Sequence, residues 1–331
     1  MNSGLICYTN SYSAYHNLAT EEYLIRECEK NNIPILFIWQ NENAVVIGKN
    51  QNAYTECNIE FAKENTIQIV RRTTGGGAVY HDLGNINFSI ILPKFQYDTE
   101  KTIDMIVAAL NNIGVNAKKN GRNDICIGEE KISGNAFYSN EKVGMHHGTI
   151  LYELNETTMA SVLSVPKYKL SKHGVSSVKS RVTDIKSKYP RIQIEDIFKT
   201  IKNQFMISFG LSEIEEKNID KNDINDSLIK KYYSDEWNIN KICQYETLFD
   251  KLFDWGYLRM TVKYEGNQLV DLEFESDSLE VDVLEEIKER VKLNIGMGIN
   301  MPFSKAIEEF ESEKTKRIAT DIYELCSETD L

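Results

Sequence analysis

Short apolar runs bounded by polar or small residues recur through the first half of the chain. Runs of this length, rich in Ile, Val and Phe, are typical of buried strands, because a strand needs only about 4–8 residues to cross a sheet. They predict strands at residues 35–40, 44–48, 67–72, 86–92, 124–127, 131–138 and 143–153.

Two segments show helical spacing instead. In residues 100–113 the apolar side chains recur every three or four positions, and Gly114 follows the last of them. Residues 194–209 repeat this pattern and are followed by Gly210. Such spacing places the apolar side chains on one face of a helix, and glycine suits the left-handed residue that often ends one. Strands interspersed with such helices predict an α+β fold.

The last third of the chain has a different organisation. Its predicted elements are a polar connector at 213–227, a hairpin of two alternating strands at 258–264 and 270–274, and helices at 280–293 and beyond 303. A hairpin followed by helices is enough to form a small unit of its own. We therefore expect a large domain of residues 1–244 and a small α+β C-terminal domain of residues 245–331.

Composition narrows the class of protein. The chain has 331 residues and a formal net charge of −12, which argues against nucleic-acid binding, since that requires a basic surface. It contains no apolar run of about 18 residues and no charged, apolar leader at its N-terminus. Its six cysteines are scattered and form no C-x-x-C pair. We expect a cytoplasmic, monomeric enzyme that binds no membrane.

The segment from Arg71 to Asp82 is the first candidate site. It reads Arg71-Arg72-Thr73-Thr74-Gly75-Gly76-Gly77-Ala78-Val79-Tyr80-His81-Asp82. A glycine-rich turn lets backbone N–H groups approach a ligand closely, and a neighbouring arginine adds a fork suited to phosphate or carboxylate. The alternative is a tight hairpin with solvated arginines. The segment matches neither a P-loop nor a dinucleotide-binding loop.

A second cluster surrounds Lys131. The run from Gly121 to Ala136 holds Asn123, Asp124 and Lys131, and His146-His147-Gly148 follows it. A lysine in this position can meet a carboxylate or phosphate, although by itself Glu129-Glu130-Lys131 is equally typical of an exposed hairpin tip. The adjacent histidines face opposite sides of a strand, which argues against a paired metal site. Cys126 lies between two isoleucines, where a small buried side chain is the ordinary interpretation and a nucleophile the alternative.

These motifs, in this order, resemble the lipoate–protein ligase A family. They are the segment 71–82, Gly121-Arg122-Asn123-Asp124, Lys131-Ile132-Ser133-Gly134-Asn135-Ala136, His146-His147-Gly148-Thr149-Ile150-Leu151 and the basic segment 167–184. The resemblance is strong over residues 1–210 and weaker beyond them. It implies a biotin/lipoate ligase-like fold of mixed sheets flanked by helices, with a C-terminal accessory domain.

The resemblance implies a reaction in two steps. Lipoate and ATP would give lipoyl-AMP, and the lipoyl group would then pass to a lysine of an acceptor domain, in the E2 subunits of 2-oxoacid dehydrogenases or the glycine cleavage H protein. Lys131 matches the essential lysine, and the segment 167–184 matches the loop that closes over the adenylate. By the same resemblance the ATP-binding residues are Arg72, Gly77, Ala78, Val79, Tyr80, Asn123, Asp124 and Lys131, and the lipoate-binding residues are Arg72, Gly75, Gly76, His81, Lys131 and His147.

Asp124 is also the candidate contact for Mg²⁺, which prefers one or two carboxylates together with substrate phosphates. Two other functions stay open from the sequence. One is an octanoyl- or lipoyl-transferase that uses no ATP, which the basic segment and the C-terminal domain disfavour. The other is a binder of lipoate or its adenylate without catalysis, which the presence of Arg72 and Lys131 disfavours.

Overall fold

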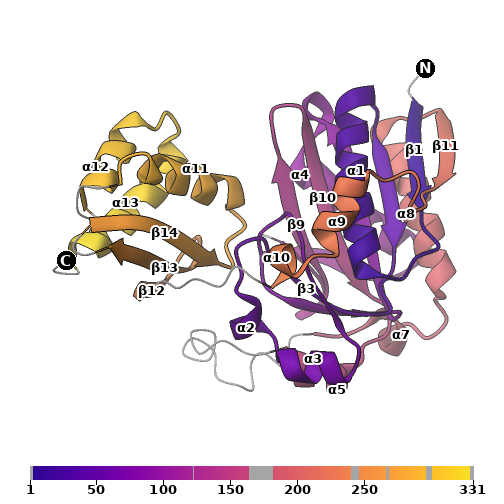
Figure 1. The fold of residues 1–331 in the computed structure, drawn as a ribbon. Coiled ribbons are helices and arrows are strands. Elements are labelled where there is room, and N and C mark those ends of the chain that lie inside the picture. Colours follow the sequence, from indigo (N-terminus) through magenta and orange to yellow (C-terminus); the bar gives the residue numbers. More distant parts are fainter. Residues whose placement is uncertain are drawn as a thin grey trace. The chain divides into compact units, whose positions relative to one another are not determined.

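The computed structural model describes residues 3–121, 123–163, 182–239, 246–265, 268–295 and 300–328. Their contacts divide the chain into two units (Figure 1). The first unit comprises Met1–Ile47, Ala53–Thr73 and Ala78–Asn240, and the second comprises Gly48–Asn52, Thr74–Gly77 and Lys241–Leu331. The domain boundary predicted between residues 244 and 245 lies outside the described residues and stays a prediction.

An eight-stranded mixed sheet forms the centre of the first unit. Its strands in spatial order are β11 (Glu213–Asn218), β1 (Ser3–Tyr8), β2 (Ile35–Trp39), β6 (Asn85–Pro93), β10 (Val143–Leu151), β9 (Glu130–Ser139), β8 (Asp124–Ile127) and β7 (Ala117–Asn120). Strand β1 is parallel to both of its neighbours, and the other pairs are antiparallel. Strand β6 lies in the middle of the sheet, and each of its residues is buried.

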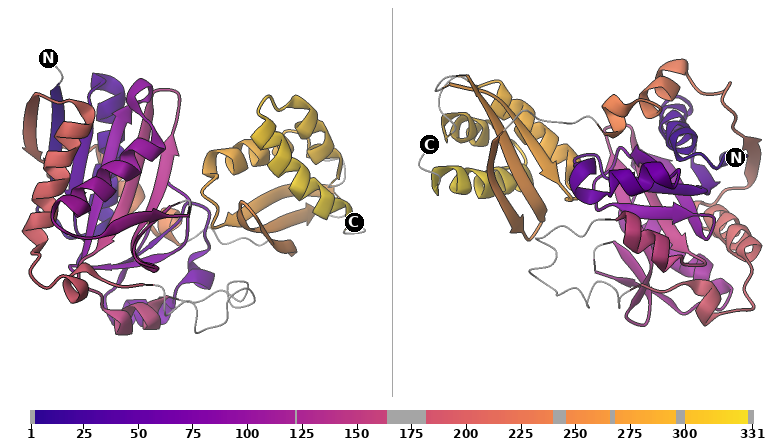
Figure 2. Two further views of the ribbon diagram at one scale, coloured as in Figure 1. Left: turned by 180° about the vertical axis from the view of Figure 1, so that it is seen from behind. Right: turned by 60° about the horizontal axis from the view of Figure 1, so that its bottom comes forward.

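Helices cover both faces of this sheet (Figures 1 and 2). Helices α1 (Ala14–Asn31) and α9 (Asp226–Tyr232) pack on one face, and α4 (Thr99–Asn112) and α8 (Ile194–Phe209) on the other. Both predicted helices, α4 and α8, are confirmed. The glycine after each adopts a positive φ, 90° at Gly114 and 62° at Gly210, which is the left-handed conformation that lets the chain leave a helix.

A second, three-stranded sheet completes the first unit, in the order β4 (Gln68–Arg71), β3 (Asn43–Ile47), β5 (Val79–Asp82). Ala44 and Val46 pack into the core beneath α1, whereas Val45 and Ile47 pack on the opposite face. The remaining short helices are α2 (Ala53–Glu56), α3 (Ile59–Glu64), η1 (Lys94–Gln96), α5 (Glu156–Val162), α7 (Ile185–Lys188) and α10 (Asp235–Asn238). Because β3 is buried on both faces, it appears in the sequence as an apolar run.

All seven predicted strands of this unit are present, but the connector predicted at 213–227 is wrong. Residues Glu213–Asn218 form β11, and α9 begins at Asp226. Strand β11 lies at the edge of the sheet and pairs only with β1. An edge strand with little buried surface can be as polar as a loop, and charged side chains there discourage pairing with other chains. Its pattern therefore carried no strand signal.

The second unit contains an antiparallel sheet of β12 (Glu246–Phe253), β13 (Gly256–Glu265) and β14 (Gln268–Ser276), followed by α11 (Val281–Lys292), α12 (Asn300–Glu309) and α13 (Glu313–Glu328). The predicted hairpin and helices are confirmed. Leu258, Met260 and Leu272 form its core together with apolar residues of the three helices. No helix among the described residues is long and apolar enough to span a membrane.

Candidate functional site

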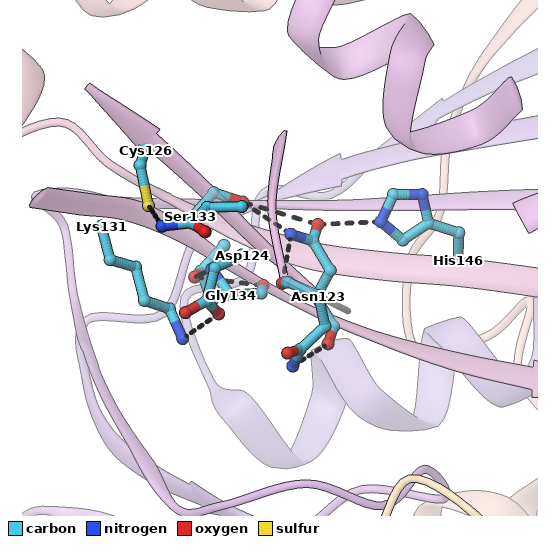
Figure 3. Close-up of polar contacts among 10 residues, drawn as sticks. Asn123, Asp124, Cys126, Lys131, Ser133, Gly134 and His146 are labelled. Atoms are coloured by element: carbon cyan, nitrogen blue, oxygen red, sulfur yellow. Dashed lines mark hydrogen bonds and ion pairs between the residues drawn. The ribbon is translucent and has the colours of Figure 1, made fainter. Parts of the chain in front are cut away.

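Lys131 lies at the start of β9, where β8 and β9 form a hairpin with an irregular register. Its ammonium Nζ is 2.7 Å from Asp124 Oδ1, and the two side chains are 35% and 36% exposed. Figure 3 shows the two groups meeting beside Gly134. The Lys131 carbonyl accepts a hydrogen bond from the Thr183 amide, 3.0 Å away. The end of the segment 167–184 is thus attached to the strand at Lys131, whereas residues 167–181 lie outside the described residues.

A row of residues on one face of the large sheet leads from Lys131 toward its centre. A Cβ atom at Gly134 would lie 3.1 Å from Lys131 Nζ, so a side chain there would crowd the lysine. The Gly134 amide donates to Thr149 Oγ1 on β10 at 3.2 Å. Thr149 in turn is the register partner of Asn87 on β6, and Asn87 is that of Trp39 on β2. Register partners share a face of an antiparallel sheet.

A buried carboxylate lies further along the same face. Glu21 of α1 is 2% exposed and accepts hydrogen bonds from Ser89 Oγ at 2.5 Å and His147 Nδ1 at 2.8 Å. Trp39 Nε1 donates to Ser89 Oγ at 3.2 Å. A carboxylate this deep requires cations and donors around it, because burial without them is costly. The predicted pocket residue His147 therefore belongs to a connected polar network.

Arg72 and His81 are brought to the same interior. Arg72 is buried and donates from Nη1 to the Val46 carbonyl at 3.1 Å. Burial lowers its pKa to about 10, while the charge of Glu21 acts in the opposite direction. Burial, followed by the nearby charges of Arg72 and His147, lowers the pKa of His81 to about 3. His81 is consequently a neutral imidazole in the folded protein.

The hydrogen bonds around His81 also define its tautomer. Asn17 Nδ2 donates to the carbonyls of Ser11 and Gln40 and to Asn41 Oδ1, which orients both amides. Asn41 Nδ2 then donates to His81 Nδ1 at 3.1 Å. A neutral imidazole that accepts at Nδ1 carries its hydrogen on Nε2. This Nε2–H is buried and has no partner among the described residues, so it is a donor open to a ligand.

Other predicted site residues have different surroundings. Asn123 Nδ2 donates to the Asn135 carbonyl at 3.0 Å, and the Asn123 carbonyl accepts from Asn135 Nδ2 at 2.9 Å, so Asn123 holds the start of β8 against β9 (Figure 3). His146 Nε2 pairs with Asn135 Oδ1 at 2.8 Å on the opposite face of β10 from His147. His146 is therefore part of the core.

Residues 78–81 divide between the two faces of β5. Val79 and His81 face the interior beneath α1, whereas Ala78 and Tyr80 face the other way. The Tyr80 hydroxyl donates to Asn43 Oδ1 at 3.0 Å, beside an open polar pocket of about 770 Å³. The structure thus does not bring Tyr80 to the side of β5 on which His81 lies.

The glycines Gly75, Gly76 and Gly77 group with the second unit. A Cβ atom at Gly75 would lie 2.0 Å from the carbonyl oxygen of Ser278, and the Gly76 amide donates to that oxygen at 3.3 Å. Close approach of another backbone therefore explains why residue 75 is glycine. Gly76 has a φ of 93°, which a side chain would strain.

Cys126 is the register partner of Lys131 but is buried, and burial raises the pKa of its thiol. The other described cysteines, Cys7, Cys28, Cys57 and Cys326, are also buried and form no disulfide. A protonated, inaccessible thiol is a poor nucleophile. Within the described part of the chain, no three His, Cys, Asp or Glu residues are grouped closely enough to hold a metal ion.

Sequence reasoning missed Glu21, Asn87 and Ser89. Glu21 shares a helical face with Leu18 and Ile25. An acid within such an apolar stripe is the feature of the sequence that could have indicated a buried carboxylate. On β6, Asn85, Asn87 and Ser89 alternate with Ile86, Phe88 and Ile90. In a strand that is buried on both sides, such alternation marks one polar face inside the protein.

The fold is that of the lipoate ligase class. The chain is similar to P. falciparum LipL1, solved in complex with lipoate, with a TM-score of 0.85 and 26% identity over 97% of this chain and 99% of that one. It is also similar to the bipartite lipoate protein ligase of Thermoplasma acidophilum (TM-score 0.63, 27% identity, 74% and 98% coverage). A lipoate-protein ligase A bound with ATP matches with a TM-score of 0.62 and 26% identity over 73% of this chain and all of that one.

The family model of the lipoyl protein ligase A/B catalytic domain matches residues 13–206, more than half of the chain. The protein belongs to this family. The α+β class expected from the sequence is confirmed, and the matched residues include Glu21, Arg72, His81, Lys131 and His147.

Proposed function

We propose that the protein is an ATP-dependent lipoate–protein ligase. In the first step, a lipoate carboxylate oxygen attacks the α-phosphorus of ATP, forming lipoyl-AMP and releasing pyrophosphate. In the second, the ε-amine of an acceptor lysine attacks the acyl carbon, an amide forms and AMP leaves. The observation that carries the proposal is the position of Lys131. Its ammonium lies at the end of a polar row that leads to the buried network of Glu21, in a chain of the lipoyl ligase family.

Lys131 suits the first step because two anions must approach each other there. Asp124 accepts one of the three ammonium N–H groups, and no other described residue is paired with the ammonium. Two N–H groups then remain for a carboxylate and a phosphate oxygen. A cation held in place offsets the repulsion between the reactants and stabilises the charge that develops at phosphorus.

The interior of the site suits the acyl ligand. Arg72, His81 and His147 are the predicted lipoate-binding residues that the structure gathers around Glu21 and Trp39. The neutral His81 offers a free Nε2–H, and the P. falciparum relative was solved with lipoate. Gly75 and Gly76 stay predicted ligand residues on the resemblance alone.

ATP is proposed as the second substrate, supported by the ATP-bound relative. Arg72, Asn123, Asp124, Lys131 and the segment 77–80 are its proposed contacts. A nucleotide would bring Mg²⁺ with its phosphates, since Mg²⁺ needs few protein carboxylates. Asp124 would be the protein contact for that ion, which would offset charge on the phosphates.

The proposed acceptors are lipoyl domains of E2 subunits and the glycine cleavage H protein, and the relative from T. acidophilum was described together with its E2 lipoyl domain. An ATP-independent acyltransferase is the alternative. The buried, protonated thiol of Cys126 gives no support to a thioester route.

The test is lipoate-dependent exchange of labelled pyrophosphate into ATP with purified protein and Mg²⁺. Exchange that requires lipoate establishes the adenylating step, and lipoylation of an E2 domain after ATP is added establishes the transfer. A folded protein that shows no exchange but moves an octanoyl group from a thioester to the same domain would overturn the proposal in favour of the transferase.

A further inference from the structure

Two neighbouring amides on β6 are buried without a full set of hydrogen bonds. Asn85 and Asn87 are 2% and 1% exposed. Asn85 Nδ2 donates to Asn87 Oδ1 at 2.9 Å, and this leaves Asn85 Oδ1 and Asn87 Nδ2 without a partner among the described residues. Buried polar groups are nearly always paired, so an unpaired one in a central strand calls for an explanation such as a ligand.

Asn87 lies at the same level of the sheet as Lys131. It is directly opposite Thr149, which accepts a hydrogen bond from Gly134, and the Lys131 ammonium lies over Gly134. Two strand spacings, about 10 Å, therefore separate the backbone of Asn87 from that of Gly134. The lysine and asparagine side chains extend over the same face, which brings their N–H groups within reach of one small ligand group.

The free groups facing this interior favour an anion. Lys131 contributes a positive charge, and both Asn87 Nδ2 and the buried His81 Nε2 are donors without a partner among the described residues, whereas Asn85 Oδ1 is an acceptor in the same position. Such donors match carboxylate oxygens, which only accept hydrogen bonds. An alkyl chain placed against Asn87 would leave its N–H unpaired, so the polar end of the acyl ligand is the better match.

We propose that Asn87 Nδ2 donates a hydrogen bond to a carboxyl oxygen of the acyl ligand whose other oxygen faces Lys131. The inference rests on the proposed function and adds a binding residue to it. After activation, the same N–H faces the acyl carbonyl oxygen, on which negative charge develops as the acceptor amine attacks. Asn87 would thus contribute to both steps by the same contact.

The experiment measures binding of lipoate, octanoate and the neutral lipoamide to the full-length protein by calorimetry. The variants are Asn87→Leu, which keeps the size but removes the donor, and Asn87→Asp, which replaces the donor by an acceptor. Asn85→Leu is the matched control, because it breaks the same amide pair two residues away on the same face. Thermal melts verify that each variant is folded.

A hydrogen bond to a charged group predicts that Asn87→Leu weakens lipoate and octanoate equally, by about tenfold to a hundredfold. Asn87→Asp should weaken binding of the two acids more than Asn87→Leu does. It should also shift the preference toward lipoamide, whose amide can donate to the new carboxylate. A merely structural role would not reverse that preference. Asn85→Leu should weaken binding of the two acids less than Asn87→Leu does.

Three results would overturn the inference. Unchanged lipoate binding in a folded Asn87→Leu variant would indicate that water satisfies the amide, and a loss of affinity for lipoate but not octanoate would assign the donor to the sulfur end of lipoate. An equal loss of affinity in Asn85→Leu would also overturn it. Failure of the unmodified protein to bind either acid would instead contradict the proposed function itself.

Discussion

Replacing Lys131 by methionine separates the chemistry of this site from its stability. Methionine keeps most of the length of the side chain and removes the charge. The pair that is lost, Lys131 and Asp124, is about one-third exposed on both sides. Exposed pairs of this kind contribute about 0–1 kcal/mol to the free energy of unfolding, so the variant should fold normally.

The effect on activity should be far larger. A preorganised donor that faces charge developing in a transition state is worth about 100- to 1,000-fold in rate, and Lys131 is proposed to face two anions at once. We therefore expect lipoate-dependent ATP–pyrophosphate exchange to fall by at least about 100-fold, with the melting temperature within a few degrees of the original.

Lys188→Ala is the matched control. Lys188 Nζ lies 2.5 Å from Glu130 Oε2, the residue before Lys131, and the two side chains are 40% and 39% exposed. Its removal should cost as little stability and leave the exchange rate unchanged. A Lys131→Met protein that keeps normal exchange, or a Lys188→Ala protein that loses it to the same extent, would refute the assignment of Lys131.

Three further predictions follow from the buried groups. Glu21→Ala should lower the free energy of unfolding by about 3–5 kcal/mol, because it leaves buried donors unpaired, and Glu21→Gln should lower it by less. Urea titrations of the two variants and the unmodified protein measure this difference. Equal stability of all three proteins would contradict the network. Burial lowers the pKa values of His81 and His146 to about 3. As the pH falls, the unfolded chain therefore binds protons at these histidines before the folded protein does. The free energy of unfolding should fall from about pH 6.5 toward pH 3, by about 1.4 kcal/mol per pH unit for each histidine. His146→Gln should make this slope in urea titrations shallower, and an unchanged slope would refute the assignment. Cys126→Ser should keep ligase activity, and iodoacetamide should modify Cys126 slowly at neutral pH; loss of activity in a folded serine variant would favour the thiol route.

The sequence predicted most elements because the patterns that carry them are local. Residues 100–113 and 194–209 have a helical stripe followed by a glycine, and the helices end two residues before Gly114 and directly before Gly210. The apolar runs of β2, β3 and β6 are buried strands, as their length and composition indicate. Strand β11 was missed because an edge strand needs no apolar face, and only its pairing with β1 identifies it.

The candidate site was foreseen in part, through motifs that stand close together in the chain. Arg72, His81, Lys131 and His147 were singled out from their motifs, and the structure places Arg72, His81 and His147 in one interior. Glu21, which connects His147 to Ser89, was not predicted as a site residue, since an acid on an amphipathic helix is ordinarily solvated.

The sequence by itself therefore determined the class of fold, most of its elements and the family of the protein, because periodicity, turn residues and short motifs are properties of neighbouring residues. Tertiary structure alone decided which of these residues meet. Ser278 lies about 200 residues from Gly75 and yet occupies the space that a side chain there would need. Glu21 meets His147 only when α1 packs on the sheet, and Asn87 meets Thr149 only when β6 pairs with β10. Neither pairing can be predicted from the residues that neighbour each partner in the sequence.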